Sequence, residues 1–361
     1  MRIMTVIGTR PEIIRLSLII KRLDKLCEHI LVFTGQNYNP KLSSVFFKEL
    51  GVREPNVNLN VRCDNFGEQI GLIFTGIEKV LKQYNPDRVL ILGDTNSGLS
   101  AIVAKRMGIP VYHMEAGNRC YDDRVPEEVN RRVIDQCSDI LLPYTENSRK
   151  NLLAEGFPNY RIYVIGNPIF EVIQFYQKSI DESDILSRLG VSPKKYFLVT
   201  MHRAENVDVP SRLRSLLLAI DKLSKKFSIP GICSIHPRTH SRMKQLGLGA
   251  HYAGVHFLEP FGFFDFINLE KNAFCVLSDS GTVQEECCIL GTPNVTIRDV
   301  TERPETIECG SNILSGVDRI EECVRVVLEN RRNWCPPREY LQKNVSEVVV
   351  RILMGFYDVF R

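Results

Sequence analysis

Residues 274–305 read FCVLSDSGTVQEECCILGTPNVTIRDVTERPE, and they contain the pattern that decides the fold. The apolar run at 274–277 is typical of a short buried strand, and the small polar residues at 279–282 end it. A helix is predicted after this turn, and Gly291 and Pro293 are expected to stop it. Residues 295–297 are predicted to form the next strand. This order of elements is typical of a parallel α/β sheet.

The turn of this unit has the properties of an anion-binding site. Ser280 is a favourable N-cap residue, and the free amides and the dipole of the following helix favour a phosphate there. One turn further on, Glu285 and Glu286 are placed to direct a carboxylate back to the bound group, for example to the hydroxyls of a ribose. Arg298 and a charged loop at 301–305 follow the next strand. A capped helix after a buried strand also occurs without any ligand, so the spacing alone leaves both interpretations open.

Length and composition predict an ordinary soluble protein of two domains. The chain has 361 residues, which fits two domains better than one. Its hydrophobic content of 44% and charged content of 25% are ordinary, and a net charge of +3 does not favour nucleic acid as a partner. The sequence has no run of 18 apolar residues and no export signal. We therefore expect a cytoplasmic protein with no membrane partner.

The cysteines and the absent motifs argue against metals and redox cofactors. Eleven cysteines without a Cys-x-x-Cys pair predict free thiols in a reducing compartment. Cys287 and Cys288 are expected to be small core residues. The sequence contains no G-x-G-x-x-G after its first strand, no P-loop and no D-x-D pair. We therefore predict no cofactor and no metal site.

Short apolar strands alternate with helical segments along the chain. Strands are predicted at residues 3–7, 30–34, 88–92, 110–114, 139–143 and 162–165, with helices at 13–26 and 66–83. A second series of strands is predicted at residues 196–200, 231–235, 254–258, 274–277 and 294–297. This alternation predicts two doubly wound, Rossmann-like domains, each a parallel sheet covered on both faces. The boundary is expected near residues 166–168, and ligands are expected beyond the carboxyl ends of the strands, in a cleft between the domains.

Four titratable residues are predicted near such strand ends, namely Asp94, Glu115, Glu127 and His202. Asp94 also fits a cap of the helix near Thr95, Glu127 an ordinary first-turn acid, and His202 a capping or core histidine. A carboxylate at Glu115, between an apolar strand and Ala-Gly, is not needed for folding. At the mouth of one cleft, the four residues would form an acid/base cluster.

Six motifs follow one another along the chain. They are GTRPE at residues 8–12, GDT at 93–95, HMEAG at 113–117, PEE at 126–128, HRAEN at 202–206, and DSGTVQEE at 279–286 followed by RDVTERPE at 298–305. In these motifs the chain resembles the non-hydrolysing UDP-N-acetylglucosamine 2-epimerases. The resemblance implies the two-domain glycosyltransferase-B fold, a UDP-sugar substrate and a homodimer. It also implies a last helix that returns to the first domain, which gives domains of residues 1–166 with 345–361, and 167–344.

The resemblance also implies a reaction. UDP leaves by anti elimination through an oxocarbenium-like transition state, 2-acetamidoglucal forms, and UDP adds again after protonation from the other face. By motif match, Asp94, Glu115 and Glu127 are the catalytic carboxylates, one acting as base and another as acid. His202 is the fourth catalytic candidate and is also expected to face the diphosphate.

The remaining expected site residues bind the substrate. Arg10, Ser280 and the amide of Gly281 are suited to the charge that grows on the diphosphate. By motif match, Glu286 binds the ribose and Phe266 flanks the uracil, although a core position is the ordinary reading of Phe266. The other candidates are Arg15, Thr282, Arg298, Thr301, Glu302 and Arg303.

Three departures from the family pattern affect the substrate prediction. Thr282 stands where a second glycine is usual, and Arg15 stands where a lysine is usual, an exchange that changes how an anion is held. Gln36-Asn37-Tyr38-Asn39 replaces a segment that binds an activating sugar in several members. With other local motifs, this resembles the branch that epimerises UDP-2-acetamido-2,6-dideoxyhexoses on the way to UDP-N-acetyl-L-fucosamine.

Other functions remain open on the sequence. A glycosyltransferase would use the same fold, but three carboxylates around the sugar would then be unexplained. A hydrolysing epimerase would release N-acetylmannosamine and UDP. A nucleotide-sugar sensor is disfavoured because every motif carboxylate is present.

Overall fold

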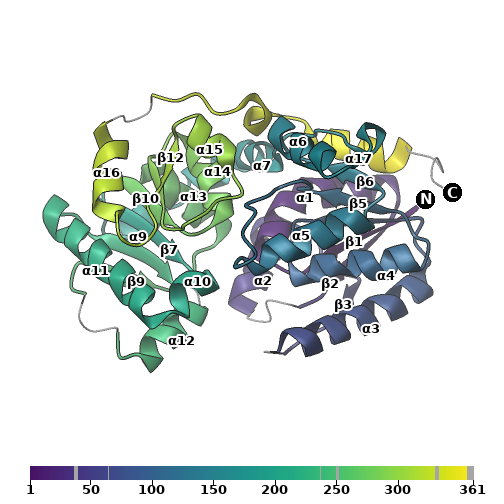
Figure 1. Cartoon of the computed structure of the whole chain (residues 1–361), viewed down its shortest axis with the longest axis horizontal. Coiled ribbons are helices and arrows are strands. Elements are labelled where there is room, and N and C mark those ends of the chain that lie inside the picture. Colours follow the sequence, from purple (N-terminus) through teal and green to yellow (C-terminus); the bar gives the residue numbers. More distant parts are fainter. Residues whose placement is uncertain (36–39, 64, 236, 249–251, 330–332, 356–361) are drawn as a thin grey trace. The chain divides into compact units, whose positions relative to one another are not determined.

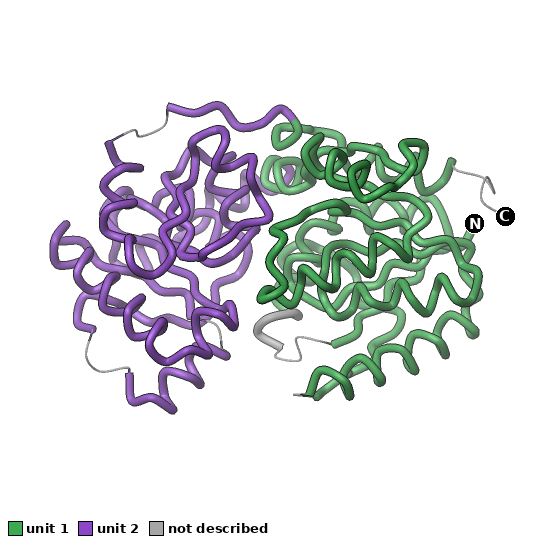
Figure 2. The backbone as a smooth tube through the Cα atoms, viewed as in Figure 1, with its two compact units in different colours: residues 1–174, 339–361 green, residues 175–338 purple. Residues whose placement is uncertain are grey.

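The computed structural model describes residues 1–35, 40–63, 65–235, 237–248, 252–329 and 333–355. The Gln36–Asn39 segment, and with it the activator prediction, lies outside the described residues, as does the end of the predicted last helix. The chain forms two compact units (Figure 2). Unit 1 contains residues 1–174 and 339–361, and unit 2 contains residues 175–338.

Unit 1 is a parallel sheet covered by helices (Figure 1). Its strand order is β3-β2-β1-β4-β5-β6, the doubly wound order with a switch point between β1 and β4. The strands are β1 Arg2–Ile7, β2 Glu28–Phe33, β3 Val57–Asn58, β4 Arg88–Leu92, β5 Val111–Met114 and β6 Ile140–Leu142. The helices are α1 Arg10–Leu26, α2 Pro40–Glu49, α3 Phe66–Tyr84, η1 Asn96–Leu99, α4 Ser100–Arg106, α5 Pro126–Cys137, α6 Glu146–Ala154, η2 Asn159–Arg161, α7 Pro168–Phe175, η3 Arg338–Leu341 and α17 Val345–Gly355.

Unit 2 has the same architecture. Its parallel sheet has the order β12-β11-β10-β7-β8-β9, with the switch point between β7 and β10. The strands are β7 Phe197–Met201, β8 Gly231–Ile235, β9 Val255–Leu258, β10 Cys275–Ser278, β11 Asn294–Thr296 and β12 Asn312–Leu314. The helices are α8 Gln177–Asp181, α9 Ile185–Leu189, α10 Ala204–Val207, α11 Pro210–Phe227, α12 Pro237–Gln245, α13 Phe263–Asn272, α14 Gly281–Leu290, α15 Pro304–Glu308 and α16 Ile320–Glu329.

The central strands of both sheets are buried along their length, because helices cover both faces. In unit 1, Val6 and Val89 pack with Ile73 and Ile77 of α3. In unit 2, strands β7 and β10 pack their apolar side chains against Leu216, Leu217 and Ile220 of α11. The α/β fold with two doubly wound, Rossmann-like domains is confirmed.

Some predicted boundaries differ from the structure. Residues 162–165 do not form a strand; Ile162 makes an isolated bridge with Leu141, and the amides of Tyr163 and Ile165 donate to the carbonyls of Leu141 and Pro143. β3 and β12 were not predicted, since the sequence around them contains no apolar run longer than two residues. The two compact units meet in the chain after Gln174, and Glu171 of α7 binds Ser346 in unit 1.

The C-terminal segment returns to unit 1. α17 packs against α1, and the Ser346 hydroxyl donates to Glu171 and accepts a hydrogen bond from Arg22 of α1. At the point of return, the Asn167 amide donates to the carbonyl of Glu339. In Figure 1 the yellow α17 lies beside the elements of unit 1.

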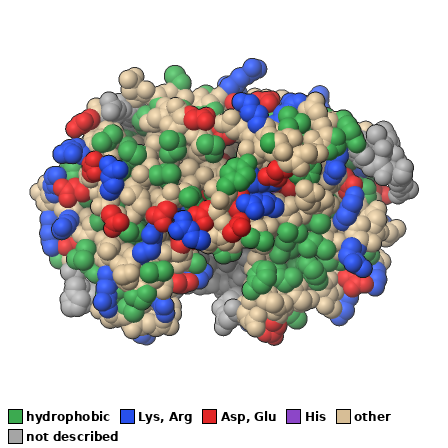
Figure 3. Space-filling model, viewed as in Figure 1, with side chains coloured by type: hydrophobic (Ala, Val, Ile, Leu, Met, Phe, Trp, Pro, Cys, Tyr) green, Lys and Arg blue, Asp and Glu red, His purple; other side chains and the backbone are tan. Residues whose placement is uncertain are grey.

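The surface matches the small net charge of the sequence. On the face seen in Figure 3, Lys and Arg side chains are interspersed with Asp and Glu side chains. Within the part of the chain that the structure describes, no helix is both long and apolar enough to cross a membrane.

Candidate active site

Three adjacent strands of unit 1 end in candidate residues. β4 lies between β1 and β5 in the sheet, and the turn after each of the three strands carries a motif. Gly8–Arg10 follows β1, Gly93-Asp94 follows β4, and Glu115 follows β5. Because carboxyl ends of parallel strands share one edge of the sheet, these residues form one half-site.

The backbone amides in the turn after β1 are hydrogen-bonded to a side chain of the same unit. The carboxylate of Glu12 accepts hydrogen bonds from the amides of Gly8 and Thr9 at 3.0 and 2.6 Å, and from the Thr9 hydroxyl at 2.7 Å. Burial raises the pKa of Glu12 to about 7, although these hydrogen bonds and one from Thr95 oppose the shift. A Cβ on Gly8 would lie 1.9 Å from the Ser97 hydroxyl, so only glycine fits there. The N-terminus of α1 is therefore occupied by Glu12.

The two arginines of α1 have different surroundings. Arg10 is partly exposed and lies over the ring of Phe46, with 5.6 Å from its guanidinium carbon to the ring centroid. Arg15 is buried, and its Nη1 lies 2.6 Å from Oε2 of Glu115. It also lies over the ring of Tyr144. The structure therefore brings Arg15 to a catalytic candidate.

Glu115 has a strained backbone. Its φ angle is +67°, in the left-handed region that residues other than glycine rarely adopt. Its amide donates to the carbonyl of Leu142 at 3.1 Å, which holds this conformation against β6. A strained residue at the end of a buried strand agrees with the prediction that Glu115 serves function rather than folding.

A buried network holds the loops beside Asp94 and Glu115. His113 faces Asp135 with one ring nitrogen at 2.8 Å and the carbonyl of Gly93 with the other at 2.9 Å. Asp135 also accepts from the Gly117 amide and forms an ion pair with Arg119 at 2.7 Å. Burial opposes ionisation of Asp135, but the hydrogen bond and charge of His113 and the charge of Arg119 lower its pKa. This network was not predicted.

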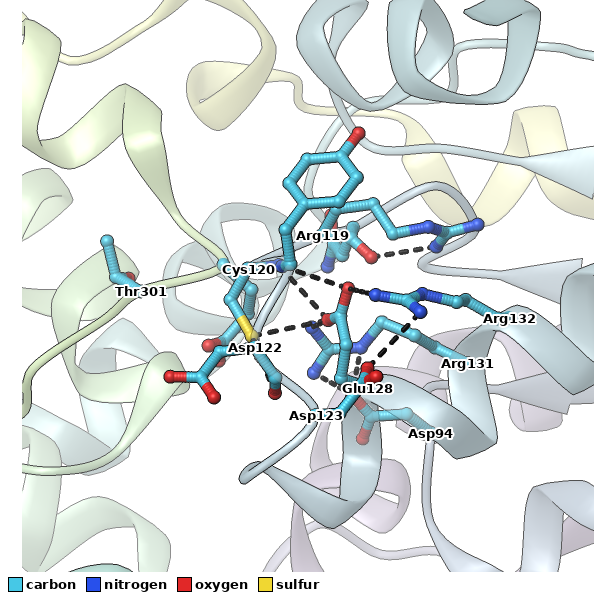
Figure 4. A network of polar contacts seen from close by, with 12 residues as sticks. Asp94, Arg119, Cys120, Asp122, Asp123, Glu128, Arg131, Arg132 and Thr301 are labelled. Atoms are coloured by element: carbon cyan, nitrogen blue, oxygen red, sulfur yellow. Dashed lines mark hydrogen bonds and ion pairs between the residues drawn. The ribbon is translucent and has the colours of Figure 1, made fainter. Parts of the chain in front are cut away.

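Asp94 forms an ion pair rather than capping a helix. Its Oδ2 accepts hydrogen bonds from Nη2 and Nε of Arg131 at 2.6 and 3.0 Å (Figure 4). Its carbonyl accepts from the Asn130 side chain. Thr95 is the N-cap residue of η1. Arg131 was not predicted from the sequence, although its position three residues after Glu128 on one helix is a detectable signal of their ion pair.

The acids of the PEE motif have separate roles. Glu127 is partly exposed in the first turn of α5, whereas Glu128 is fully buried. Glu128 accepts from the amides of Cys120 and Tyr121, both at 3.0 Å. Burial opposes ionisation of Glu128, but the Cys120 amide and the charge of Arg131 lower its pKa. Glu128 therefore holds the loop that precedes α5.

The half-site of unit 2 begins at the ends of β7 and β10. His202 follows β7, and its Nδ1 lies 3.0 Å from Oδ1 of Asp279, which follows β10. Asp279 also accepts from the amides of His202 and Arg203 and from the Asn206 side chain. Burial alone would raise the pKa of Asp279, but the charge of His202 and these hydrogen bonds lower it to about 2. His202 is therefore oriented by a buried carboxylate.

The N-terminus of α14 follows directly. Ser280 is the N-cap residue as predicted, but its hydroxyl makes no capping bond and lies 3.0 Å from that of Thr282. A Cβ on Gly281 would lie 2.4 Å from an oxygen of Glu302, so the close approach of this loop requires glycine. Gly291 ends the helix with φ +69°, as predicted.

The charged loop after β11 contains a buried cation. Arg298 is 1% exposed, and its Nη1 donates to Glu302 at 2.9 Å. Among the residues described, no hydrogen-bond acceptor contacts its buried Nη2. A buried guanidinium N–H without an acceptor is costly, so this group is suited to bind an anion.

The other predicted residues of unit 2 lie around this loop. Arg303 forms an ion pair with Glu285, with 2.6 Å from Nε to Oε1, and Thr301 donates to Gln284. Glu286 is 5% exposed in the second turn of α14. Phe266 is partly buried and packs against an apolar cluster of the core, as its ordinary reading predicts.

Taken separately, the two half-sites have different chemistry. Unit 1 brings carboxylates together with arginines, which suits proton transfer and stabilisation of a cation. Unit 2 combines a helix N-terminus with a buried arginine, which suits a phosphate. Over the described residues, no group of three or more His, Cys, Asp and Glu side chains is arranged to hold a metal ion.

The chain is similar to known epimerases over nearly its whole length. Residues 21–354 match the family model described as UDP-N-acetylglucosamine 2-epimerase. A UDP-N-acetylglucosamine 2-epimerase of Methanococcus maripaludis is 39% identical over 360 residues, which cover 97% of each chain.

Solved structures show the same likeness. The UDP-GlcNAc 2-epimerase of Methanocaldococcus jannaschii in complex with UDP-GlcNAc and UDP is 40% identical, with a TM-score of 0.94, over 99% of this chain and 100% of that one. The UDP-N-acetylglucosamine 2-epimerase of Rickettsia bellii is 42% identical, with a TM-score of 0.90, over 99% of this chain and 96% of that one.

Proposed function

This chain belongs to the UDP-N-acetylglucosamine 2-epimerase family, and we propose on that premise that it inverts carbon 2 of a UDP-2-acetamido sugar without hydrolysing it. The observation that carries this proposal is the pairing of Asp94 with Arg131 and of Glu115 with Arg15 at the ends of adjacent strands. Two carboxylates held in fixed positions provide the groups that an epimerisation needs on the sugar.

The hydrogen on carbon 2 is not acidic, so a base alone cannot remove it. We propose that the bond from carbon 1 to the UDP oxygen breaks with its electron pair on UDP, while a carboxylate takes the proton from carbon 2. The product is 2-acetamidoglucal. Protonation of carbon 2 from the opposite face and return of UDP to carbon 1 give the epimer, so no redox partner is consumed.

The residues of unit 2 fit the leaving group in this scheme. Negative charge grows on the diphosphate as UDP departs, and Arg298, His202 and the N-terminus of α14 are suited to stabilise it. Positive charge grows at carbon 1, which suits the carboxylates Asp94, Glu115 and Glu127. Assignment of Glu286 to the ribose and of Phe266 to the uracil stays a prediction.

Proton NMR of the protein with UDP-GlcNAc in deuterated water tests this function. We expect the 2-epimer, with deuterium on carbon 2 in the product. Free N-acetylmannosamine with UDP would instead indicate the hydrolysing branch, and no reaction without an added acceptor would favour a glycosyltransferase. Retention of the substrate hydrogen, or a need for added NAD, would exclude the elimination route.

We further propose that the protein is a cytoplasmic homodimer. Exposed apolar side chains on α3, Phe66 at 60% and Leu72 at 45%, support a surface that a second copy covers. Apolar side chains also gather on the face of unit 1 seen in Figure 3. Light scattering of the wild type and of Phe66→Asp with Leu72→Asp tests this, since a monomeric wild type would exclude the dimer.

A further inference from the structure

Arg131 joins two acidic residues of unit 1. It lies in α5 and is 2% exposed. Its Nε and Nη2 donate to one oxygen of Asp94, and its Nη1 donates to Oε2 of Glu128 at 2.8 Å (Figure 4). Three of its N–H groups are therefore directed by two carboxylates, which leaves the guanidinium little freedom to rotate.

Glu128 is itself held from several sides. Its side chain is fully buried and accepts the amides of Cys120 and Tyr121, while Arg132 donates to its other oxygen at 3.1 Å. These contacts fix Glu128 to the loop before α5 and so fix the plane of the Arg131 guanidinium. The loop backbone therefore holds Glu128, Glu128 holds Arg131, and Arg131 holds Asp94.

We propose that Arg131, braced by Glu128, is the positioning residue of Asp94 in the epimerisation. It holds the Asp94 carboxylate in one orientation, with 2.6 Å between Nη2 and Oδ2. Arg131 acts through Asp94 and is not itself a catalytic residue. This inference rests on the proposed function, because it concerns the same reaction.

The alternative is that Arg131 only ties α5 to the loop after β4. A structural role would change stability without a specific effect on kcat. A positioning role would lower kcat, leave KM nearly constant and depend on the presence of Asp94. These two roles therefore differ in measurable ways.

The test compares Arg131→Ala, Arg131→Lys and the control Arg106→Ala. We expect Arg131→Ala to lower kcat by about 100-fold or more with KM changed less than about threefold. Arg131→Lys should not restore kcat, because an ammonium lacks the paired N–H groups that face Asp94. Arg106 is exposed in the last turn of α4 and takes no part in these contacts, so Arg106→Ala should retain kcat within about threefold.

Two further measurements separate positioning from folding. Millimolar guanidinium should raise kcat of Arg131→Ala but not of Arg131→Lys, whose ammonium occupies the position. In an Asp94→Asn background, Arg131→Ala should lower kcat by less than about a further threefold, because both substitutions disrupt the same Asp94–Arg131 pair. Full additivity of the two losses, or wild-type kcat in Arg131→Ala, would overturn the inference. An inactive wild type would instead overturn the proposed function.

An independent observation concerns two cysteines of unit 2. Cys288 in α14 is fully buried, and Cys309, directly after α15, is partly exposed. Their Sγ atoms lie 3.6 Å apart, and the Cys309 sulfur also lies 3.3 Å from the Ser311 hydroxyl. The hydrogen bond from Cys288 lowers the pKa of Cys309 against the effect of burial, and Ser311 also lowers it.

We infer that Cys288 and Cys309 form a reversible disulfide when a peroxide oxidises the protein. The Cys309 thiolate attacks one peroxide oxygen, the O–O bond breaks, and water leaves after protonation. The resulting sulfenic acid is attacked by the Cys288 sulfur, which forms the S–S bond and releases a second water. Two thiols lose two electrons, and one peroxide gains them. A partly exposed thiolate beside a second cysteine is the usual setting for this chemistry.

Peptide mapping after hydrogen peroxide tests this pair. We expect a cross-link between residues 288 and 309 that dithiothreitol reverses, and its loss in Cys288→Ser and in Cys309→Ser. Cys335→Ser removes an exposed thiol and should leave the cross-link unchanged. Oxidation of Cys309 to the sulfinic acid without a cross-link, a link to Cys287, or no reaction at either thiol would overturn the inference.

Discussion

Arg15 and Glu115 form an almost fully buried ion pair, with 2.6 Å between Nη1 and Oε2 and side-chain exposures of 2% and 10%. Glu115 keeps a left-handed backbone in this pair. Because a buried carboxylate is stable only with a partner, the arginine of α1 and the strained turn after β5 depend on each other. Arg15 stands where a lysine is usual in the family. This exchange therefore alters the partner of Glu115, a proposed catalytic group.

The three proposed catalytic carboxylates should be separable from substrate binding. Asp94→Asn, Glu115→Gln and Glu127→Gln are each expected to lower kcat by about 10²–10⁴-fold, because each removes a proton-transfer group. UDP affinity, measured by calorimetry, should stay within about threefold of wild type. A variant that keeps wild-type turnover would lose its place in the proposed mechanism.

Because of Asp279, the stability of unit 2 should decrease at acidic pH. Its pKa is lowered from 3.8 to about 2, so its contribution to stability is present above pH 3.8 and is lost as the pH falls toward 2. Compared with Asp279→Asn, the wild type should be more stable by roughly 2 kcal/mol at pH 7, and this difference should shrink in acid. Urea unfolding of both proteins at pH 7 and pH 3 measures it. A difference that is the same at both pH values would contradict the assignment.

Glu12 should change the pH dependence of stability in the opposite direction to Asp279. Its pKa is raised from 4.5 to about 7, so the folded protein holds a proton that the unfolded chain loses between these values, and stability falls over this range. Glu12→Gln keeps the acceptor for the Gly8 and Thr9 amides without the buried charge. Relative to wild type it should gain up to roughly 3 kcal/mol from pH 4 to pH 8 in urea unfolding. The control Glu54→Gln, at an exposed site, should show no such gain.

The half-site of unit 2 should control UDP affinity. His202→Ala and Ser280→Ala are expected to weaken UDP by about tenfold each, because a hydrogen bond to a charged group contributes about 1.5–3 kcal/mol. His256→Ala, an exposed histidine on β9, is the matched control and should bind UDP as the wild type does. Unchanged affinity in both test variants would place the diphosphate elsewhere.

The narrower substrate assignment is tested by comparing two UDP-sugars. The motifs predict that a UDP-2-acetamido-2,6-dideoxyhexose is turned over faster than UDP-GlcNAc, without activation by UDP-GlcNAc. A site without polar partners for a 6-hydroxyl would discriminate in this direction. Efficient turnover of UDP-GlcNAc, with UDP-N-acetylmannosamine idle until UDP-GlcNAc is added, would exclude this branch and leave the family activity intact.

Much of the fold could be predicted because strands that are buried on both faces appear in the sequence as continuous apolar runs. β4 and β8 match their predicted bounds, whereas β3 and β12 are too short to show a pattern. Strand ends located Asp94, Glu115 and His202, since polar residues there interrupt apolar runs.

The partners of these residues could not be predicted in the same way. Asp94 and Arg131 are 37 positions apart, and His202 and Asp279 are 77 apart. Such pairs form only when the sheet brings different loops together. Periodicity identifies the face of one element and carries no information on which loop lies opposite. The missing capping bond of Ser280 has a local origin instead, because its hydroxyl contacts that of Thr282 two residues later.

The return of the C-terminal segment determines the order in which the units can be completed during synthesis. Unit 2 is inserted between residues 174 and 339 of unit 1, and α17 covers α1 through Ser346 and its contacts with Arg22 and Glu171. The ribosome therefore releases every residue of unit 2 before it releases the helix that completes unit 1. Unit 2 can finish folding on the nascent chain, while the apolar surface of α1 stays uncovered until α17 has left the ribosome.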